Sequence, residues 1–391
     1  MLKILNKYIK PQLSFFKKMR RLVAIKMLLH QRATTAGAIL GVVSIIFLVG
    51  QQLTVFFGLL DLMAALVDHS GADVWVCSKN TDNINATGSL PIRYVDRIMG
   101  LTEVEWAEPV ISSGGVVRRK DGKYQPVQVF GVARPELTGG PWRFAEGGID
   151  VLLDYEGLTI DKLDYQSLGK PRLDDVVEVS GKRVRIVGFT QGVRGFQGTL
   201  VMTNLNKARE ISQIPIDRCS NILVKFRPGM NNPKSLAKLI ELLPSAEVIP
   251  TPRLAAQTRL YYITQTGIGS SFGFSTIIGV LVGIVIITLT MYTNILNREK
   301  DFAVLRALGA RRKDILLIVF YQAIFIGLVG ILIGFLLLAL FLNGTRNTSL
   351  PTYMYAWVPP IHAVITILLC LLGSLLAMRR AIKIEPASAF R

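Results

Sequence analysis

Four long runs of apolar residues constrain this chain more than any other feature. They cover residues 35–60, 272–296, 315–342 and 359–378. Each run is long enough to cross the hydrocarbon core of a bilayer as a helix, which takes roughly 20 apolar residues. Backbone groups must be paired within the segment in lipid, so the runs predict four transmembrane α-helices. Gln51 and Gln52 interrupt the first run, and we expect its helix to leave the membrane there and continue as a stalk.

The distribution of charge predicts how these helices are oriented. The net charge is +18, yet residues 61–270 hold 25 basic and 23 acidic residues. The excess lies in residues 1–34, in residues 297–315 and in the tail after Ala377, which together hold 19 basic and 4 acidic residues. Basic residues concentrated beside apolar runs mark cytoplasmic segments and not a nucleic-acid groove. We therefore expect both termini to be cytoplasmic and no nucleic-acid partner.

The N-terminal segment has a helical pattern of its own. Leu22, Ile25, Leu28 and Leu29 fall on one helical face, with basic residues around them. This pattern predicts an amphipathic helix on the inner leaflet, although a plain basic flank of the first span would carry the same charge.

The outer region, residues 61–270, alternates strand and helix signals. Strands are predicted at 73–77, 115–118, 127–131, 176–179, 183–187, 199–202 and 221–226, and helices at 92–99, 204–211 and 234–243. Ser180-Gly181 between two of these strands predicts a hairpin. The predicted fold is an α-helical membrane protein with four transmembrane helices and a large mixed α+β extracytoplasmic domain inserted between helices 1 and 2.

The predicted order of segments follows from these patterns. It is a cytoplasmic basic segment (1–34), the first helix and stalk (35–60), the extracytoplasmic domain (61–270), the second helix (271–296), a cytoplasmic loop (297–314), the third helix (315–342), an outer loop (343–358), the fourth helix (359–378) and a cytoplasmic tail (379–391).

The cytoplasmic loop, NREKDFAVLRALGARRKDI, is the most specific motif. Phe302, Leu305 and Leu308 recur at helical spacing, and Gly309 stands where a helix would end. An ordinary basic loop with a surface helix would share the charge, but the string LRALGA followed by RRKDI resembles the coupling loop of the FtsX/MacB-like (type VII) ABC transporter permeases. GADVWV and VVEVSGKRVRIVGFTQG likewise resemble the MacB-like periplasmic core domain, and the tail IEPASAFR resembles the end of the FtsX-like permease domain.

The resemblance implies a function for the whole chain. It implies a permease subunit, of an exporter, that receives motion by mechanotransmission from a separate ABC-type ATPase in the bacterial inner membrane. ATP would be bound by that partner, and the permease would form a homodimer or pair with a paralogous permease. A membrane-fusion adaptor is a further partner consistent with the family. The residues matched to ATPase coupling are Arg298, Glu299, Asp301, Leu305, Arg306, Leu308, Gly309 and Arg311.

Motifs for catalysis are absent from the sequence. No phosphate-binding P-loop, H-E-x-x-H or C-x-x-C string occurs, so we predict no catalytic residue, no bound cofactor and no metal site. The G-x-S-x-G string around Ser271 lies at the mouth of a span and not in a strand-to-helix turn. Cys77 and Cys219 both lie in the outer region, where a disulfide is chemically allowed, but their spacing does not establish one.

Glycine pairs four residues apart occur within the spans. They are Gly37 and Gly41, Gly279 and Gly283, and Gly330 and Gly334. Small residues at this spacing permit close helix packing and can mark a subunit interface, although glycine is common in membrane helices and the spacing can arise by chance. The runs 272–296 and 317–342 contain no charged residue, which argues against a proton or ion pathway through them.

Three alternatives remain open from the sequence. A lipoprotein-releasing permease of the LolC/LolE kind would have the same topology. A division-type FtsX regulates cell-wall hydrolases, but its outer domain is usually much smaller. A membrane-anchored receptor could use the outer domain for sensing, although it would not need the LRALGA loop. The transported substrate is not encoded in any motif.

Overall fold

The structure is a computed structural model that describes residues 22–30, 32–86, 88–297, 299–307 and 310–382. The chain divides into two compact units, which are described one at a time. Residues Phe57–Ser270 and Asn347–Pro351 form one unit, here called the inserted domain. The helices on either side of it form the membrane unit.

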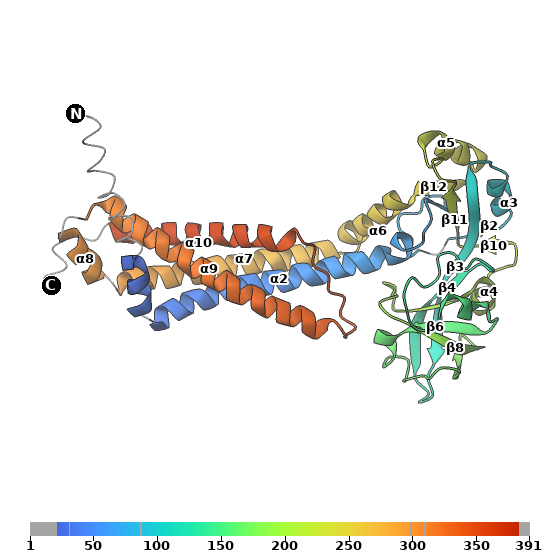
Figure 1. Ribbon diagram of the computed structural model, residues 1–391, viewed down its shortest axis with the longest axis horizontal. Coiled ribbons are helices and arrows are strands. Elements are labelled where there is room, and N and C mark those ends of the chain that lie inside the picture. The colour runs from blue at the N-terminus through green and yellow to red at the C-terminus, as the bar shows by residue number, and fades with distance from the viewer. Residues whose placement is uncertain (1–21, 31, 87, 298, 308–309, 383–391) are drawn as a thin grey trace. The chain divides into compact units, whose positions relative to one another are not determined.

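The membrane unit is built from α2 (Arg32–Asp68), whose end from Phe57 onward lies in the inserted domain, and from α7 (Ile268–Leu296), α8 (Glu299–Ala307), α9 (Arg312–Thr345) and α10 (Val358–Ile382), together with a helical segment at residues 22–30. In the part of the chain that the structure describes, four helices, α2, α7, α9 and α10, are long and apolar enough to cross a membrane. Figure 1 shows them running side by side. Val42 and Ile46 of α2 are fully buried between its neighbours, so α2 supplies the centre of the helix packing.

The inserted domain contains a ten-stranded sheet with helices packed against it. Its strands are β1 (Val74–Ser78), β3 (Val104–Arg118), β4 (Tyr124–Val132), β5 (Phe144–Glu146), β6 (Gly157–Asp161), β7 (Val176–Val179), β8 (Lys182–Thr190), β9 (Thr199–Asn204), β11 (Asn221–Phe226) and β12 (Ala246–Pro250). A separate two-stranded sheet pairs β2 (Leu90–Pro91) with β10 (Arg218–Cys219).

Six of these strands close on themselves. The pairing runs β3–β4–β9–β6–β8–β7 and returns from β7 to β3 through Val117 opposite Val179. The interior of this small barrel is filled by alternating β-branched side chains, among them Val129, Ile160 and Ile186, all nearly inaccessible. Closure leaves these six strands without free edges. The helix α4 (Leu205–Ser212) lies along β3 and β4 in Figure 1.

The remaining strands form an open sheet, ordered β12–β1–β11–β3. The helices α3 (Tyr94–Met99) and α5 (Pro233–Leu242) share a buried apolar cluster with β1 and β11. A second cluster joins Trp75 of β1 to the end of α2 and to α6 (Thr251–Gln265). The two helices that enter and leave the domain are thereby packed into its core.

The predicted fold class is confirmed: four apolar helices with a large α/β domain placed after the first of them. The hairpin predicted at Ser180-Gly181 also forms, and both turn residues have positive φ angles of 48° and 80°, as a two-residue turn between twisted strands requires. The strands β6 and β12 lie where no strand was predicted, and β3 is much longer than its predicted part.

Candidate functional site

The helix α8 lies in the segment that the sequence marks for coupling, and one of its faces is buried. Phe302 and Ala303 are 0% exposed and belong to the cluster that fills the membrane unit. Ala24 and Leu28 of the N-terminal helical segment and Ile315 of α9 belong to the same cluster. A short helix is marginal in water by itself, so this burial is what holds α8 in place.

Backbone amides at and just before the start of α9 are paired by hydrogen bonds. The amide of Ala310 donates to the carbonyl oxygen of Leu305 at 3.0 Å. At the start of α9, the amide of Arg311 donates to Asp314 Oδ2 at 2.9 Å, and the amide of Asp314 donates to the Arg311 carbonyl oxygen at 2.8 Å. This reciprocal cap satisfies donors that a helix start leaves unpaired. The basic side chains that follow are therefore presented from a fixed backbone.

The other face of α8 is open. Lys300 and Asp301 are exposed, and Val304, one turn further along α8, is 49% exposed. Arg311, which begins α9, is exposed as well, together with the two basic residues after it. An apolar centre with a polar rim is a common arrangement in protein interfaces. We call these residues, with α8 as their support, the coupling surface.

Several predicted coupling residues cannot be placed. Arg298, Leu308 and Gly309 lie outside the described residues, and the side chains of Glu299 and Arg306 are not described. Of the others, Asp301 and Arg311 are exposed, whereas Leu305 is half-buried against the membrane-unit cluster.

The apolar residues that form the coupling surface and its support were not all predicted. Phe302 was noted only for its spacing, and Val304 was missed. The anchoring role of Ala24 and Leu28 was missed too, and the one available signal was the helical periodicity of residues 22–29.

The N-terminal helical segment divides its apolar residues between two faces. Ala24 and Leu28 are buried in the cluster beneath α8, whereas Leu22, Ile25 and Leu29 are exposed. The predicted single apolar face is therefore split, and the segment packs on the membrane unit while keeping an apolar face free.

The glycines predicted for helix packing lie at contacts with α2. A Cβ atom built on Gly283 would lie 2.1 Å from Ile45 Cγ1, and one built on Gly41 would lie 2.6 Å from Ile286 Cγ2. Each of the two helices α2 and α7 therefore packs an isoleucine side chain against a glycine of the other. On α9, a Cβ atom on Gly330 would lie 2.5 Å from Val42 Cβ, and one on Gly334 would lie 2.6 Å from Ile46 Cβ.

Gly279 has looser surroundings, 3.5 Å from Val49 Cγ2. All four predicted packing glycines thus contact the chain's own first helix.

The helices that enter and leave the inserted domain are tied together. Arg259 of α6 donates through Nε to the carbonyl oxygen of Leu60 at 3.2 Å and forms an ion pair with Asp68 through its other end. Both acceptors lie on the last turns of α2. Ala64 and Leu254 are buried in the same apolar cluster. Two interactions of one arginine side chain and a shared apolar cluster therefore hold these two helix segments together.

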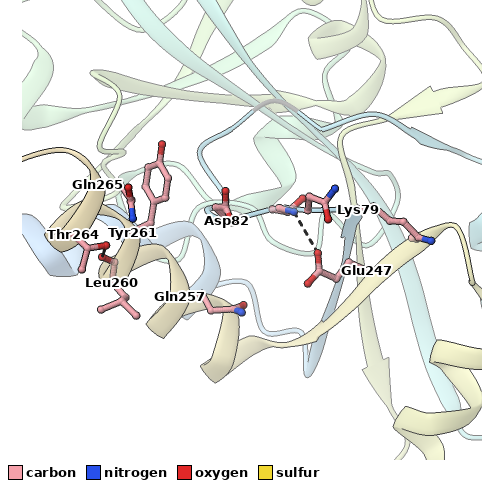
Figure 2. Close-up of a pocket in the computed structure, with 11 residues that line it drawn as sticks. Lys79, Asp82, Glu247, Gln257, Leu260, Tyr261, Thr264 and Gln265 are labelled. Carbon is pink, nitrogen blue, oxygen red and sulfur yellow. Dashed lines mark hydrogen bonds between the residues drawn. The ribbon is translucent and has the colours of Figure 1, made fainter.

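A polar groove opens beside this helix pair. It has a volume of about 960 Å³ and lies between the loop after β1, the strand β12 and α6. Figure 2 shows Lys79, Asp82 and Glu247 along one wall and Gln257, Tyr261 and Gln265 of α6 along the other. The amide of Thr81 donates to Glu247 Oε2 at 3.3 Å across the floor. Within the described ranges, no group of three His, Cys, Asp or Glu side chains is placed to hold a metal ion.

The cysteines of the inserted domain are free. Cys77 and Cys219 are buried in different apolar clusters. Burial raises the pKa of each thiol to about 12, so both stay protonated at neutral pH and are poor nucleophiles. The disulfide that the sequence allowed is not formed.

The packing of α9 on α2 generates a prediction. Replacing Gly330 by Ala would place a methyl group 2.5 Å from Val42 Cβ, a branched atom that cannot rotate away. We expect the free energy of unfolding to fall by roughly 1–3 kcal/mol, the usual cost of overpacking. Thermal unfolding of the purified protein in detergent measures the loss.

The matched control for this variant is Gly327→Ala, one turn earlier on the same helix. Its nearest neighbour is Cys370 Sγ at 3.5 Å, an ordinary contact. Equal melting temperatures for the two variants would contradict the packing account.

Comparison with solved structures gives partial likenesses. The periplasmic region of MacB from Actinobacillus actinomycetemcomitans covers 48% of this chain and 92% of its own, at 13% identity and a TM-score of 0.38. The extracellular domain of the noncanonic ABC-type transporter YknZ covers 46% of this chain and 98% of its own, at 11% identity and a TM-score of 0.34.

Curated relatives share more of the length. An uncharacterized ABC transporter permease of Mycobacterium tuberculosis strain H37Rv is 24% identical over 330 residues, which is 83% of this chain and 86% of the relative. An uncharacterized ABC transporter permease of Methanocaldococcus jannaschii is 27% identical over 175 residues, which is 42% of each chain.

Two family models together match most of the chain. The MacB-like periplasmic core domain matches residues 33–242, and the FtsX-like permease C-terminal domain matches residues 273–386. The first match alone spans more than half of the 391 residues. It covers nearly all of α2 and most of the inserted domain, and the second covers the helices that follow, α7 to α10. The chain is a multi-pass membrane protein that belongs to the MacB/FtsX type of ABC transporter permeases.

Proposed function

We propose that this permease is driven by a separate ATPase that binds the coupling surface on α8. The observation that carries the proposal is the division of α8 into two faces. Phe302 and Ala303 are sealed in the membrane unit, while Lys300, Asp301 and Val304 are open. A helix held this firmly passes on a push applied to its open face instead of yielding to it. The sequence contains no P-loop, so ATP would be bound by the partner.

The proposed transmission runs from α8 into α2. Phe302 of α8 and Val42 of α2 belong to one buried cluster, and α2 is a single helix of 37 residues. At its far end, Arg259 ties α2 to α6. Motion of the membrane unit would then reach the inserted domain through two tied helices. ATP binding would shift the population between two arrangements, as in other switching assemblies.

This mechanism favours work on a substrate outside the membrane. No charged residue lies in α7 or in residues 315–342 of α9, so these helices lack the groups that usually line an ion or proton pathway. We therefore propose an exporter that acts through the inserted domain. A homodimer with both termini in the cytoplasm, and an adaptor of the membrane-fusion type, complete the proposal.

If the ATPase binds the coupling surface, a charge introduced there should weaken its binding. Val304→Asp places a carboxylate on the open face of α8 without touching the buried face. We expect at least a tenfold loss of ATPase binding, because an uncompensated charge in an interface costs on the order of several kcal/mol. Co-purification of the ATPase with tagged permease, quantified by mass spectrometry, measures it.

The control for the coupling variant is Val176→Asp. Val176 is 56% exposed on β7 in the inserted domain, so the same change is made at a similar exposure far along the chain. We expect this variant to keep the ATPase. Full retention by Val304→Asp as well would show that the ATPase does not use this face.

The charge distribution predicts the topology. Lys120, at the turn between β3 and β4, should be reached by a membrane-impermeant thiol reagent from outside the cell once it is replaced by Cys. Cysteine at Arg391 should be protected until the membrane is opened. Intact and permeabilised cells are compared for each variant, in a background where Cys77, Cys219 and Cys370 remain because they are buried. Labelling of both sites from the same side would exclude the topology.

A further inference from the structure

The loop between β8 and β9, residues 191–198, is firmly anchored where it leaves the barrel. The amide of Val193 donates to Asp161 Oδ2 at 2.8 Å, and the hydroxyl of Thr190 donates to the same oxygen at 3.0 Å. Asp161 is fully buried at the end of β6. Hydrogen bonds to Asp161 therefore hold the first residues of the loop against the barrel.

Arg194, the next residue, joins the barrel to a distant segment. Its Nη2 atom lies 3.6 Å from Asp164 Oδ1, and its Nη1 atom donates to the carbonyl oxygen of Ser349 at 2.8 Å. Ser349 lies in Asn347–Pro351, the part of the α9–α10 connection that belongs to the inserted domain. We call this segment the outer strap.

The Arg194–Asp164 pair is buried. The side chain of Arg194 is 15% exposed and that of Asp164 is 7% exposed. Among the described residues, neither Asp164 Oδ2 nor Arg194 Nε has a hydrogen-bond partner. Two buried charges are costly unless they stay paired, so the guanidinium is held against Asp164 while its Nη1 atom reaches the strap.

The same loop also contacts α6 and is linked to α2 through Asn85. The ring of Phe196 meets the ring of Tyr262 on α6 edge to face, with centroids 4.4 Å apart. Gln197 Nε2 donates to the carbonyl oxygen of Asn85 at 2.7 Å, and Asn85 Nδ2 donates to the Met63 carbonyl oxygen on α2 at 2.9 Å. The eight residues of this loop thus contact the barrel, α6 and the outer strap, and reach α2 through Asn85.

We propose that Arg194 is a latch that fastens the outer strap to the barrel, giving the inserted domain an attachment to the permease chain in addition to α2 and α6. The sequence fits this use, because an arginine fork can hold a carboxylate and a carbonyl oxygen at once, which a lysine cannot do with the same geometry. The latch constrains where the strap lies when the tied helices move. Its part in an ATP-driven cycle rests on the proposed function, whereas the attachment itself does not.

Hydrogen–deuterium exchange on the full-length protein in nanodiscs, without nucleotide, tests the attachment. In Arg194→Ala we expect the amides of residues 348–350 to exchange roughly tenfold faster than in the wild type, because a hydrogen bond to a charged group is lost and the strap opens more often. Arg118→Ala is the matched control. Arg118 forms an ion pair at 3.8 Å with Glu178 on the same barrel, and its side chain is 57% exposed. We expect this control to leave the strap unchanged.

Two further variants guard against a folding defect. Arg194→Lys keeps the buried positive charge and loses the fork, and Asp164→Asn keeps the side-chain shape and loses the charge that orients Arg194. Each should raise exchange in the strap while the core strands of the barrel stay protected. If strap exchange matches the wild type in Arg194→Ala and in Arg194→Lys, the latch is overturned.

The nucleotide arm separates this proposal from the proposed function. With the ATPase bound, ATP should change strap exchange in the wild type and not in Arg194→Ala. If the strap is released by Arg194→Ala but ATP never changes its exchange in the wild type, the latch stands and the ATP-driven movement fails. If the strap responds to ATP equally in both proteins, Arg194 does not link the strap to the moving domain.

Discussion

Close packing of uncharged helices against α2 is the constraint on which the rest of the structure depends. Lipid offers apolar helices no hydrophobic reason to associate, so their association relies on close van der Waals contact. Gly283 on α7 and Gly330 on α9 provide that contact by letting Ile45 and Val42 approach the neighbouring backbone. The helix α2 continues from the membrane unit into the inserted domain, so one helix takes part in the packing of each.

A few specific contacts connect α8, α2, α6, the barrel and the outer strap. α8 adds no span of its own, yet Phe302 places it in the cluster that surrounds α2. Arg259 joins α2 to α6, and Arg194 joins the barrel to the outer strap. Arg259 therefore joins the two helices through which the chain enters and leaves the inserted domain, and Arg194 holds the outer strap, where the chain returns to that domain. Under the proposed function, motion begins at a docked helix and ends at a closed barrel, both of which resist deformation.

The sequence predicted the parts that depend on local pattern. Uncharged apolar runs predicted the spans, because backbone pairing in lipid leaves no other solution, and the period of Phe302 and Leu305 predicted α8. It did not predict most of β3, where Pro109 and the pair Gly114-Gly115 obscure the strand signal although the residues pair with β11 and β4. Nor could it predict the contacts of Arg194 or of Ala24, since their partners are far along the chain and no periodicity links them.

The most direct test of transmission through the tied helices is a distance measured between two copies of α6. A single spin label at Leu260, which is exposed, reports the separation of the two copies in the reconstituted complex by pulsed electron resonance. The account predicts one distance distribution without nucleotide and a shifted one with ATP trapped, with the shift lost when the ATPase cannot engage α8. An identical distribution in both nucleotide states, in a complex that hydrolyses ATP and contains two labelled copies, would contradict it.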